Sequence, residues 1–240
     1  MKKTILLSTL FMFSFTFGFD ISYSAKSFLW KEFDDRGKQL LKESGFLHEV
    51  GFSHNFETNL LYFKPYIGLE LGSVEYDGAT QSGTPVKSNT NYWGVLTKLP
   101  IGKNIKGFYI ESGIGYNYWK RNIETTNKAI GYTETWSETY IPLKVGLKIQ
   151  QNQAIFYTFG EYRFILKTKN EPSIFPVSLE PKTGTHFSIG LGAKKSHFFM
   201  EICYSYDKWK KSDAEYYQSY AIYQPESKKE VLKITFGYSY

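Results

Sequence analysis

Two residues of this chain, His186 and Ser188, suggest catalysis because they share one face of an expected strand, with Glu201 on the next expected strand. A serine beside a histidine and a carboxylate can act as a nucleophile in acyl transfer. Hairpin pairing, however, puts Ser188 opposite about Tyr204, and at about 3.3 Å per residue Glu201 then lies about 10 Å farther along the strand. The spacing therefore favours a histidine at a strand end beside an inward-facing serine, and we predict no catalytic residue.

Charged residues recur on the non-apolar side of the expected strands, where they would face the inside of a closed sheet. Opposite charges are interleaved there, so they would either line a polar path for ions and small solutes or form a plug of paired side chains. Long side chains can fill the interior of a barrel of about ten strands, which favours the plug. The predicted lumen cluster consists of Glu70, Glu111, Lys144, Glu161, Arg163 and Glu201.

The composition argues against several other kinds of site. Cys203 is the single cysteine, which excludes an intramolecular disulfide and any multi-cysteine zinc or iron–sulfur site. His48 and His54 come without a carboxylate cluster, so we expect no metal site and no cofactor. The formal net charge of +6 suits anionic lipid headgroups, but no polybasic tract indicates nucleic acid as a partner.

The elements that carry these residues alternate apolar and polar side chains with a period of two, as strands with two different faces require. The clearest example is the final segment. One of its faces consists of Leu232, Ile234, Phe236, Tyr238 and Tyr240, and the other of Lys233, Thr235, Gly237 and Ser239. We predict ten strands, at about 19–33, 45–56, 59–76, 89–101, 106–122, 131–149, 153–168, 184–195, 197–208 and 229–240.

The connections between these strands alternate in length. Tight turns are predicted at 57–58, 102–105, 150–152 and 195–196, and long polar loops at 34–44, 77–88, 123–130, 169–183 and 209–228. This layout is typical of outer-membrane barrels, with turns in the periplasm and loops outside, and an even strand number puts both termini in the periplasm. Pro65 and Pro142 fall inside predicted strands, and we assign them to bulges.

Strand length separates a membrane barrel from a soluble sheet, which would show the same alternation. Several runs reach 12 to 18 residues, whereas soluble strands typically have about five or six. Aromatic residues near strand ends are predicted to form interfacial girdles: Trp30, Trp93, Tyr116, Tyr118, Trp119, Trp136, Tyr204, Tyr206 and Trp209. We therefore predict an all-β fold, a closed antiparallel transmembrane β-barrel of about ten strands, with eight as the alternative number.

The N-terminal residues have the pattern of a secretory signal peptide. Two lysines precede an apolar run over 5–19, which is shorter than the roughly 20 residues that a membrane-spanning helix needs. Small residues allow cleavage after Gly18 or after Ser24. We predict a signal peptide over 1–18 and a barrel over 19–240.

The ending Leu232-Lys-Ile-Thr-Phe-Gly-Tyr-Ser-Tyr240 resembles the C-terminal strand signal of Gram-negative outer-membrane β-barrel proteins, in which Phe is commoner than Tyr at the last position. The segments 30–37 and 41–45 resemble the first hairpin of small, uncharacterised barrels in that group. This resemblance implies the cell outer membrane as the location, and the barrel-assembly machinery, outer-membrane lipids and lipopolysaccharide as partners. It implies no activity.

The histidines of this chain can be set against the motifs of two enzyme families of that group. His186-Phe-Ser188 is similar to part of the motif of lipid A 3-O-deacylases, but Ile189 stands where that family has Asn. Omptin-type proteases share the ten-strand architecture and use an Asp-x-His unit, and no histidine of this chain has Asp two positions before it. The residues therefore disfavour both activities.

Three functions follow from these observations, in order. The first is a non-enzymatic outer-membrane barrel with a structural, adhesive or surface-binding role, acting through its extracellular loops on an unidentified ligand. The last loop, 209–228, combines several Tyr with Lys, a mixture that suits binding. The alternative is a narrow channel for ions or small solutes, and the third is a lipid A-modifying enzyme.

Overall fold

The computed structural model describes residues 16–80 and 83–240. The predicted signal peptide lies almost wholly outside these residues, so its boundary with the barrel stays a prediction. In the described part of the chain, no helix is long and apolar enough to span a membrane. The long strands are β1 (Thr16–Phe33), β2 (Gln39–Glu57), β4 (Tyr66–Ala79), β5 (Pro85–Ile105), β6 (Phe108–Ile123), β7 (Thr133–Gln151), β8 (Ala154–Pro172), β9 (Lys182–Lys195), β10 (Phe198–Lys210) and β13 (Glu226–Ser239).

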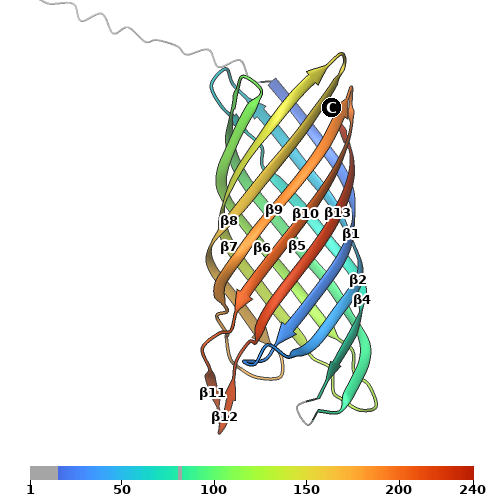
Figure 1. The fold of residues 1–240 in the computed structure, drawn as a ribbon, viewed down its shortest axis with the longest axis vertical. Coiled ribbons are helices and arrows are strands. Elements are labelled where there is room, and N and C mark those ends of the chain that lie inside the picture. Colours follow the sequence, from blue (N-terminus) through green and yellow to red (C-terminus); the bar gives the residue numbers. More distant parts are fainter. Residues whose placement is uncertain (1–15, 81–82) are drawn as a thin grey trace, which may run out of the picture.

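These strands form one antiparallel ring (Figure 1). Each pairs with its neighbours along the chain, and β1 pairs with β2 on one side and with β13 on the other, from Asp20 opposite Ser239 to Phe33 opposite Glu226. The predicted all-β antiparallel barrel of about ten strands is therefore confirmed. Three short strands lie outside this set: β3 (Tyr62–Phe63), β11 (Glu215–Tyr217) and β12 (Tyr220–Ile222).

The two ends of the barrel differ in their connections. The connections 58–61, 106–107, 152–153 and 196–197 are short and lie at one end, here called the turn end, where β1 begins and β13 ends. The opposite end, here called the loop end, carries the longer connections and the small hairpin of β11 and β12, visible at the bottom of Figure 1.

Several predicted connections were placed wrongly. The loops predicted at 34–44 and 77–88 are too long, because β2 already begins at Gln39, β4 continues to Ala79 and β5 begins at Pro85. The chain reverses at Lys106 and Gly107 rather than within 102–105, because both residues have positive φ (47° and 88°), as a two-residue hairpin turn requires. The last loop is shorter than the predicted 209–228, because β10 continues to Lys210, β13 already begins at Glu226, and the hairpin occupies part of the interval.

The two prolines interrupt the sheet in different ways. Pro65 lies between β3 and β4, so the predicted strand 59–76 is broken there. Pro142 lies within β7, in a gap of the β6–β7 ladder between the pairs of Leu143 and Tyr140. The register shift of β7 lies instead at Thr139/Tyr140, on the β8 side. Since proline has no N–H to donate to a ladder, both positions are ones that a sheet tolerates.

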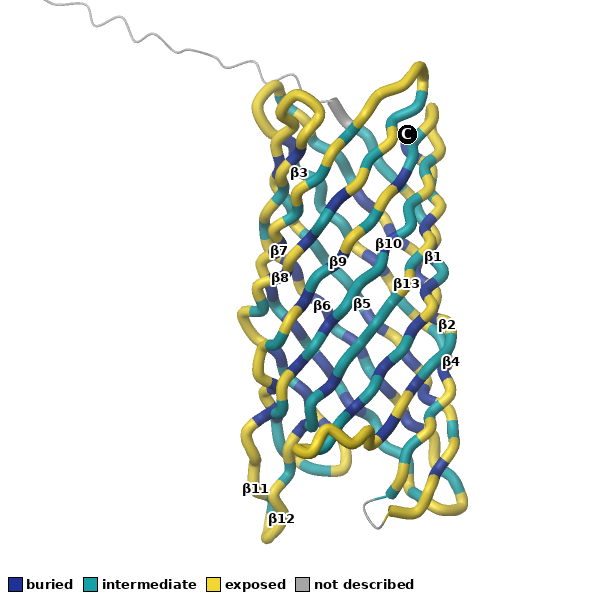
Figure 2. The backbone as a smooth tube through the Cα atoms, viewed as in Figure 1, coloured by how far each residue is buried: buried dark blue, intermediate teal, exposed yellow. Residues whose placement is uncertain are grey.

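Exposed and buried residues alternate along the strands (Figure 2). The outer face is rich in exposed aliphatic and aromatic side chains, for example Ile67, Leu69 and Leu71 on β4. The C-terminal set, Leu232, Ile234, Phe236, Tyr238 and Tyr240, is exposed in the same way. Outward apolar residues with inward polar residues are the pattern of a barrel wall that faces lipid.

The predicted aromatic girdle is wrong for four of the five tryptophans. Trp30, Trp119, Trp136 and Trp209 are buried inside the barrel, whereas Trp93 is 48% exposed on its outer face. The physical reason is strand parity: Trp30, for example, shares its face with the inward residues Lys26 and Glu32. Closeness to a strand end was a poorer guide than the face of the strand.

Candidate functional site

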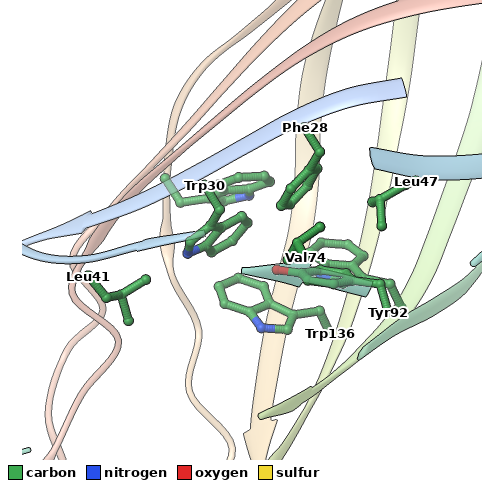
Figure 3. Close-up of a cluster of buried hydrophobic side chains, with 9 residues drawn as sticks. Phe28, Trp30, Leu41, Leu47, Val74, Tyr92 and Trp136 are labelled. Atoms are coloured by element: carbon green, nitrogen blue, oxygen red, sulfur yellow. The ribbon is translucent and has the colours of Figure 1, made fainter. Parts of the chain in front are cut away.

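The four inward tryptophans form a packed layer across the loop half of the lumen. Figure 3 labels Trp30 and Trp136 of this layer. The ring centroids of Trp30 lie 5.3 Å from Trp136 and 5.4 Å from Trp209, and Trp119 stacks on Trp136 at 5.4 Å. Such edge-on and offset contacts are favourable for aromatic rings. We call this layer, together with Arg121 and the carboxylates that it binds, the lumen block.

Arg121 lies at the centre of the lumen block with no exposed surface. Its guanidinium binds three carboxylates, those of Glu32 at 3.0 Å, Glu43 at 3.0 Å and Glu134 at 2.6 Å. It also stacks over the Trp30 ring, 4.9 Å from the ring centroid. One cation cannot neutralise three carboxylates, so the remaining lone pairs need other donors.

Tryptophan and hydroxyl groups supply those donors. The indole N–H of Trp30 donates to Glu32 and that of Trp136 donates to Glu134, both at 2.9 Å. The carboxylate of Glu43 accepts hydrogen bonds from Thr90, at 2.7 Å, and from Tyr92. Because the same tryptophans both pack the layer and satisfy its carboxylates, the aromatic and the ionic parts of the block depend on one another.

A second ionic group continues from the block towards the middle of the barrel. The indole N–H of Trp209 donates to Glu138 at 2.9 Å. Asp207 binds Arg163 and also lies 3.0 Å from the Lys229 ammonium and 3.3 Å from Nδ1 of His186. Charged side chains in this region therefore bind one another rather than lining an open path.

The structure places the His186–Ser188–Glu201 set differently from a catalytic site. Ser188 pairs with Ser205 rather than with about Tyr204, and Glu201 pairs with Gly192. The neighbour of His186 is instead Asp207, which the sequence analysis did not consider. His186 and Ser188 are both buried inside the barrel. No hydrogen bond joins them in the described part of the structure, so the arrangement has no activated serine.

The turn half of the lumen contains a cavity of about 340 Å³. It extends from Asp20 and Lys64, near the turn end, to Phe28 and Trp119 at the lumen block. All six residues of the predicted lumen cluster line it: Glu70, Glu111, Lys144, Glu161, Arg163 and Glu201. The six residues predicted to face the lumen thus lie on the cavity wall, and their function there stays a prediction.

Five of these six residues have a partner of opposite charge, and the sixth, Glu201, has a hydroxyl partner. Glu111 lies 3.7 Å from Lys144, and Glu161 lies 3.2 Å from Lys98. Lys26 bridges Glu70 and Glu49, a pair that the sequence analysis missed although Lys26 has the inward parity of its strand. Glu70, Glu111 and Glu161 each bind a lysine, Arg163 binds Asp207, and Glu201 accepts a hydrogen bond from Tyr157 at 3.2 Å.

No group of three or more His, Cys, Asp or Glu suited to a metal ion occurs within 16–80 and 83–240. No model of a protein family matches the chain, and no curated protein matches it. Solved structures do: the outer membrane protease OmpT from Escherichia coli superposes with a TM-score of 0.56, covering 95% of this chain and 98% of that one at 11% identity. The chain has the fold of Gram-negative outer-membrane β-barrels.

Other barrels of this fold superpose less well. The translocator domain of the autotransporter NalP from Neisseria meningitidis reaches a TM-score of 0.49 at 14% identity, covering 92% of this chain and 88% of that one. Ail, the attachment invasion locus protein of Yersinia pestis, reaches 0.39 at 11% identity, covering 93% and 99%. At such identities the likeness concerns the outer-membrane barrel fold and carries no activity.

Proposed function

We propose that this protein is an outer-membrane barrel that acts through the surface at its loop end rather than as a pore. The observation that carries the proposal is the lumen block, in which Trp30, Trp136 and Arg121 have no exposed surface. An aqueous path would have to pass through this layer. The apolar outer face supports the location, since a wall of exposed aliphatic residues suits lipid.

The loop end supplies the surface for this role. The hairpin of β11 and β12 extends beyond the ring, and its Tyr216 and Tyr220 are 75% and 64% exposed. Ion pairs join neighbouring segments at the loop end: Lys182, at the start of β9, lies 2.5 Å from Asp213, and Lys211 lies 2.7 Å from Asp35. The hydrogen bond that the Lys211 ammonium donates to the Asp35 carboxylate raises the pKa of Lys211. Tyrosines on a tethered hairpin are large, rigid contacts of the kind that binding surfaces use.

The alternative, a narrow channel, is favoured by the polar cavity in the turn half of the lumen. Single-channel recording in planar bilayers distinguishes the two functions. We expect the protein, extracted from outer membranes as a heat-modifiable barrel, to give no conductance steps. Reproducible steps would establish the channel. A lipid-modifying enzyme is less well supported, because Ser188 and His186 lie inside the barrel, away from acyl chains outside.

The surface-binding role is tested by replacing residues 214–223 with a short Gly-Ser linker. The replacement spares Trp209, Gln224 and Ser227, which are buried, so the barrel should keep its heat-modifiable gel mobility. Cells that display the protein would be screened on arrays of glycans and matrix proteins. We expect binding that the replacement abolishes, whereas a ligand bound equally by both forms would exclude the hairpin as the contact.

A further inference from the structure

Four lysines stand side by side on the outer face of the barrel. Lys208 of β10 pairs directly with Lys228 of β13, Lys228 with Lys31 of β1, and Lys31 with Lys42 of β2. Directly paired residues project on the same side of a sheet. We call this set the lysine row; with adjacent strands about 4.8 Å apart, it spans about 14 Å of the outer wall.

The row is electrostatically unfavourable on its own, because like charges directly opposite on neighbouring strands destabilise a sheet. At one end, Glu226 relieves it, lying 3.0 Å from the Lys208 ammonium and 3.4 Å from that of Lys228. At the other end, Lys31 and Lys42 form no ion pair within 4.0 Å with any carboxylate in the described ranges. Asp77 pairs with Lys42 in the sheet, but its carboxylate lies 3.5 Å from Lys87.

The position of the row relative to the apolar face indicates what kind of ligand could reach it. On β10, Tyr204 and Tyr206 precede Lys208 on the outer face, and their rings contact Phe187 at 6.4 and 5.6 Å. On β1, Leu29 precedes Lys31 on the same face. On β13, Glu230 lies on the outer face between Leu232 and Lys228 and accepts a hydrogen bond from Tyr204 at 3.1 Å. Since barrel strands are tilted by about 35–45°, the row runs obliquely across the wall, on the loop-end side of these residues.

We propose that the lysine row binds the phosphate groups of a phosphorylated glycolipid, of the lipid A type, in the leaflet at the loop end. Such a molecule has two complementary parts: acyl chains that lie on the apolar wall, and phosphates at the height where the wall becomes basic. Phosphate oxygens would supply the counter-charge that Lys31 and Lys42 lack. The inference rests on the proposed outer-membrane location and gives the lipopolysaccharide partner that the resemblance implies a binding site.

The opposite wall shows that the row is a local feature. There Lys120 of β6 pairs with Trp93 on one side and with Thr135 on the other, and Thr135 pairs with Glu171. Lys167 is also exposed on this wall but lies 3.1 Å from Glu180. The double substitution Lys120→Gln/Lys167→Gln therefore removes the same amount of charge without touching the row, which makes it a matched control.

The test uses the full barrel folded in zwitterionic detergent and titrated with purified diphosphorylated lipid A. The readout is the temperature at which the heat-modifiable gel band disappears. We expect lipid A to raise this temperature for the wild type and for the control variant. Lys31→Gln/Lys42→Gln should melt at the same or a higher temperature without lipid, because repulsion is relieved, and should need at least about tenfold more lipid A for the same shift.

Two further probes identify the source of the phosphate. Lipid A stripped of its phosphates should give less than half of the shift, and inorganic phosphate at the same concentration should give none. An equal shift with either probe, or equal responses of the Lys31→Gln/Lys42→Gln variant and the wild type, would overturn the proposal. Melting in detergent is independent of conductance and of cell fractionation, so its failure is distinguishable from failure of the proposed function. The single variant Lys31→Gln serves if the double variant does not fold.

Discussion

The two halves of the lumen are filled with side chains in different ways. In the loop half, four tryptophans and Arg121 with its carboxylates leave no exposed surface on the central side chains. In the turn half, lysines and glutamates line a cavity of about 340 Å³, and Lys98 keeps 32% of its side chain exposed. Both halves pair their charges, and the turn half also has single rings beside them, such as Phe159, whose centroid lies 4.2 Å from the Lys144 ammonium. Among the described residues, the stacked tryptophans lie in the loop half. We therefore expect the stacked tryptophans around the charges to close the lumen.

The difference also predicts how much each ionic group contributes to stability. A buried carboxylate that loses its cation keeps its charge in a medium that solvates it poorly, whereas a carboxylate beside a cavity can be solvated after the loss. Substitutions in the block should consequently have much larger effects than the same kind of substitution in the cavity.

The largest effect is expected for Arg121→Met, which leaves Glu32, Glu43 and Glu134 buried without a cation. We expect a loss of about 3–5 kcal/mol in the free energy of unfolding, or failure to form the heat-modifiable barrel. Urea unfolding in lipid vesicles measures it. A loss of less than about 1 kcal/mol would mean that the two halves do not differ in the way proposed.

Trp136→Ala should be the next most damaging change, because Trp136 is fully buried, contacts the other three tryptophans and donates to Glu134. Truncation of a buried tryptophan costs about 3–5 kcal/mol. The same variant is informative in planar bilayers. If the block closes the lumen, the variant should give conductance steps that the wild type lacks, and silence of both would show that residues besides the tryptophans close it.

The smallest effect is expected for Lys98→Met in the cavity. Its partner Glu161 lies 3.2 Å away, but the lysine is partly exposed, so we expect a loss of about 1 kcal/mol or less. Urea unfolding under the conditions used for Arg121→Met gives the direct comparison. A loss as large as that of Arg121→Met would remove the distinction between the two halves.

The sequence predicted the parts of this structure that depend on one strand at a time. Alternation and strand length gave the barrel, and inward parity put residues such as Glu161 on the cavity wall. Parity would also have placed Trp30 and Trp209 inside, but they were assigned by their closeness to strand ends. The contacts of Arg121 with Glu32 and Glu43 span 89 and 78 residues. They depend on barrel diameter and strand stagger, which no single strand encodes.

The seam between β1 and β13 has a consequence for biogenesis. The ring closes by pairing the first long strand with the last, from Asp20 opposite Ser239 to Phe33 opposite Glu226. Until residues 226–239 have been synthesised and have reached the membrane, one edge of β1 is unpaired and the ring of strands stays open. Pairing between segments so distant in sequence is slow. The barrel therefore cannot close strand by strand during translation. We expect the chain to need a chaperone in the aqueous compartment until β1 and β13 have both reached the membrane.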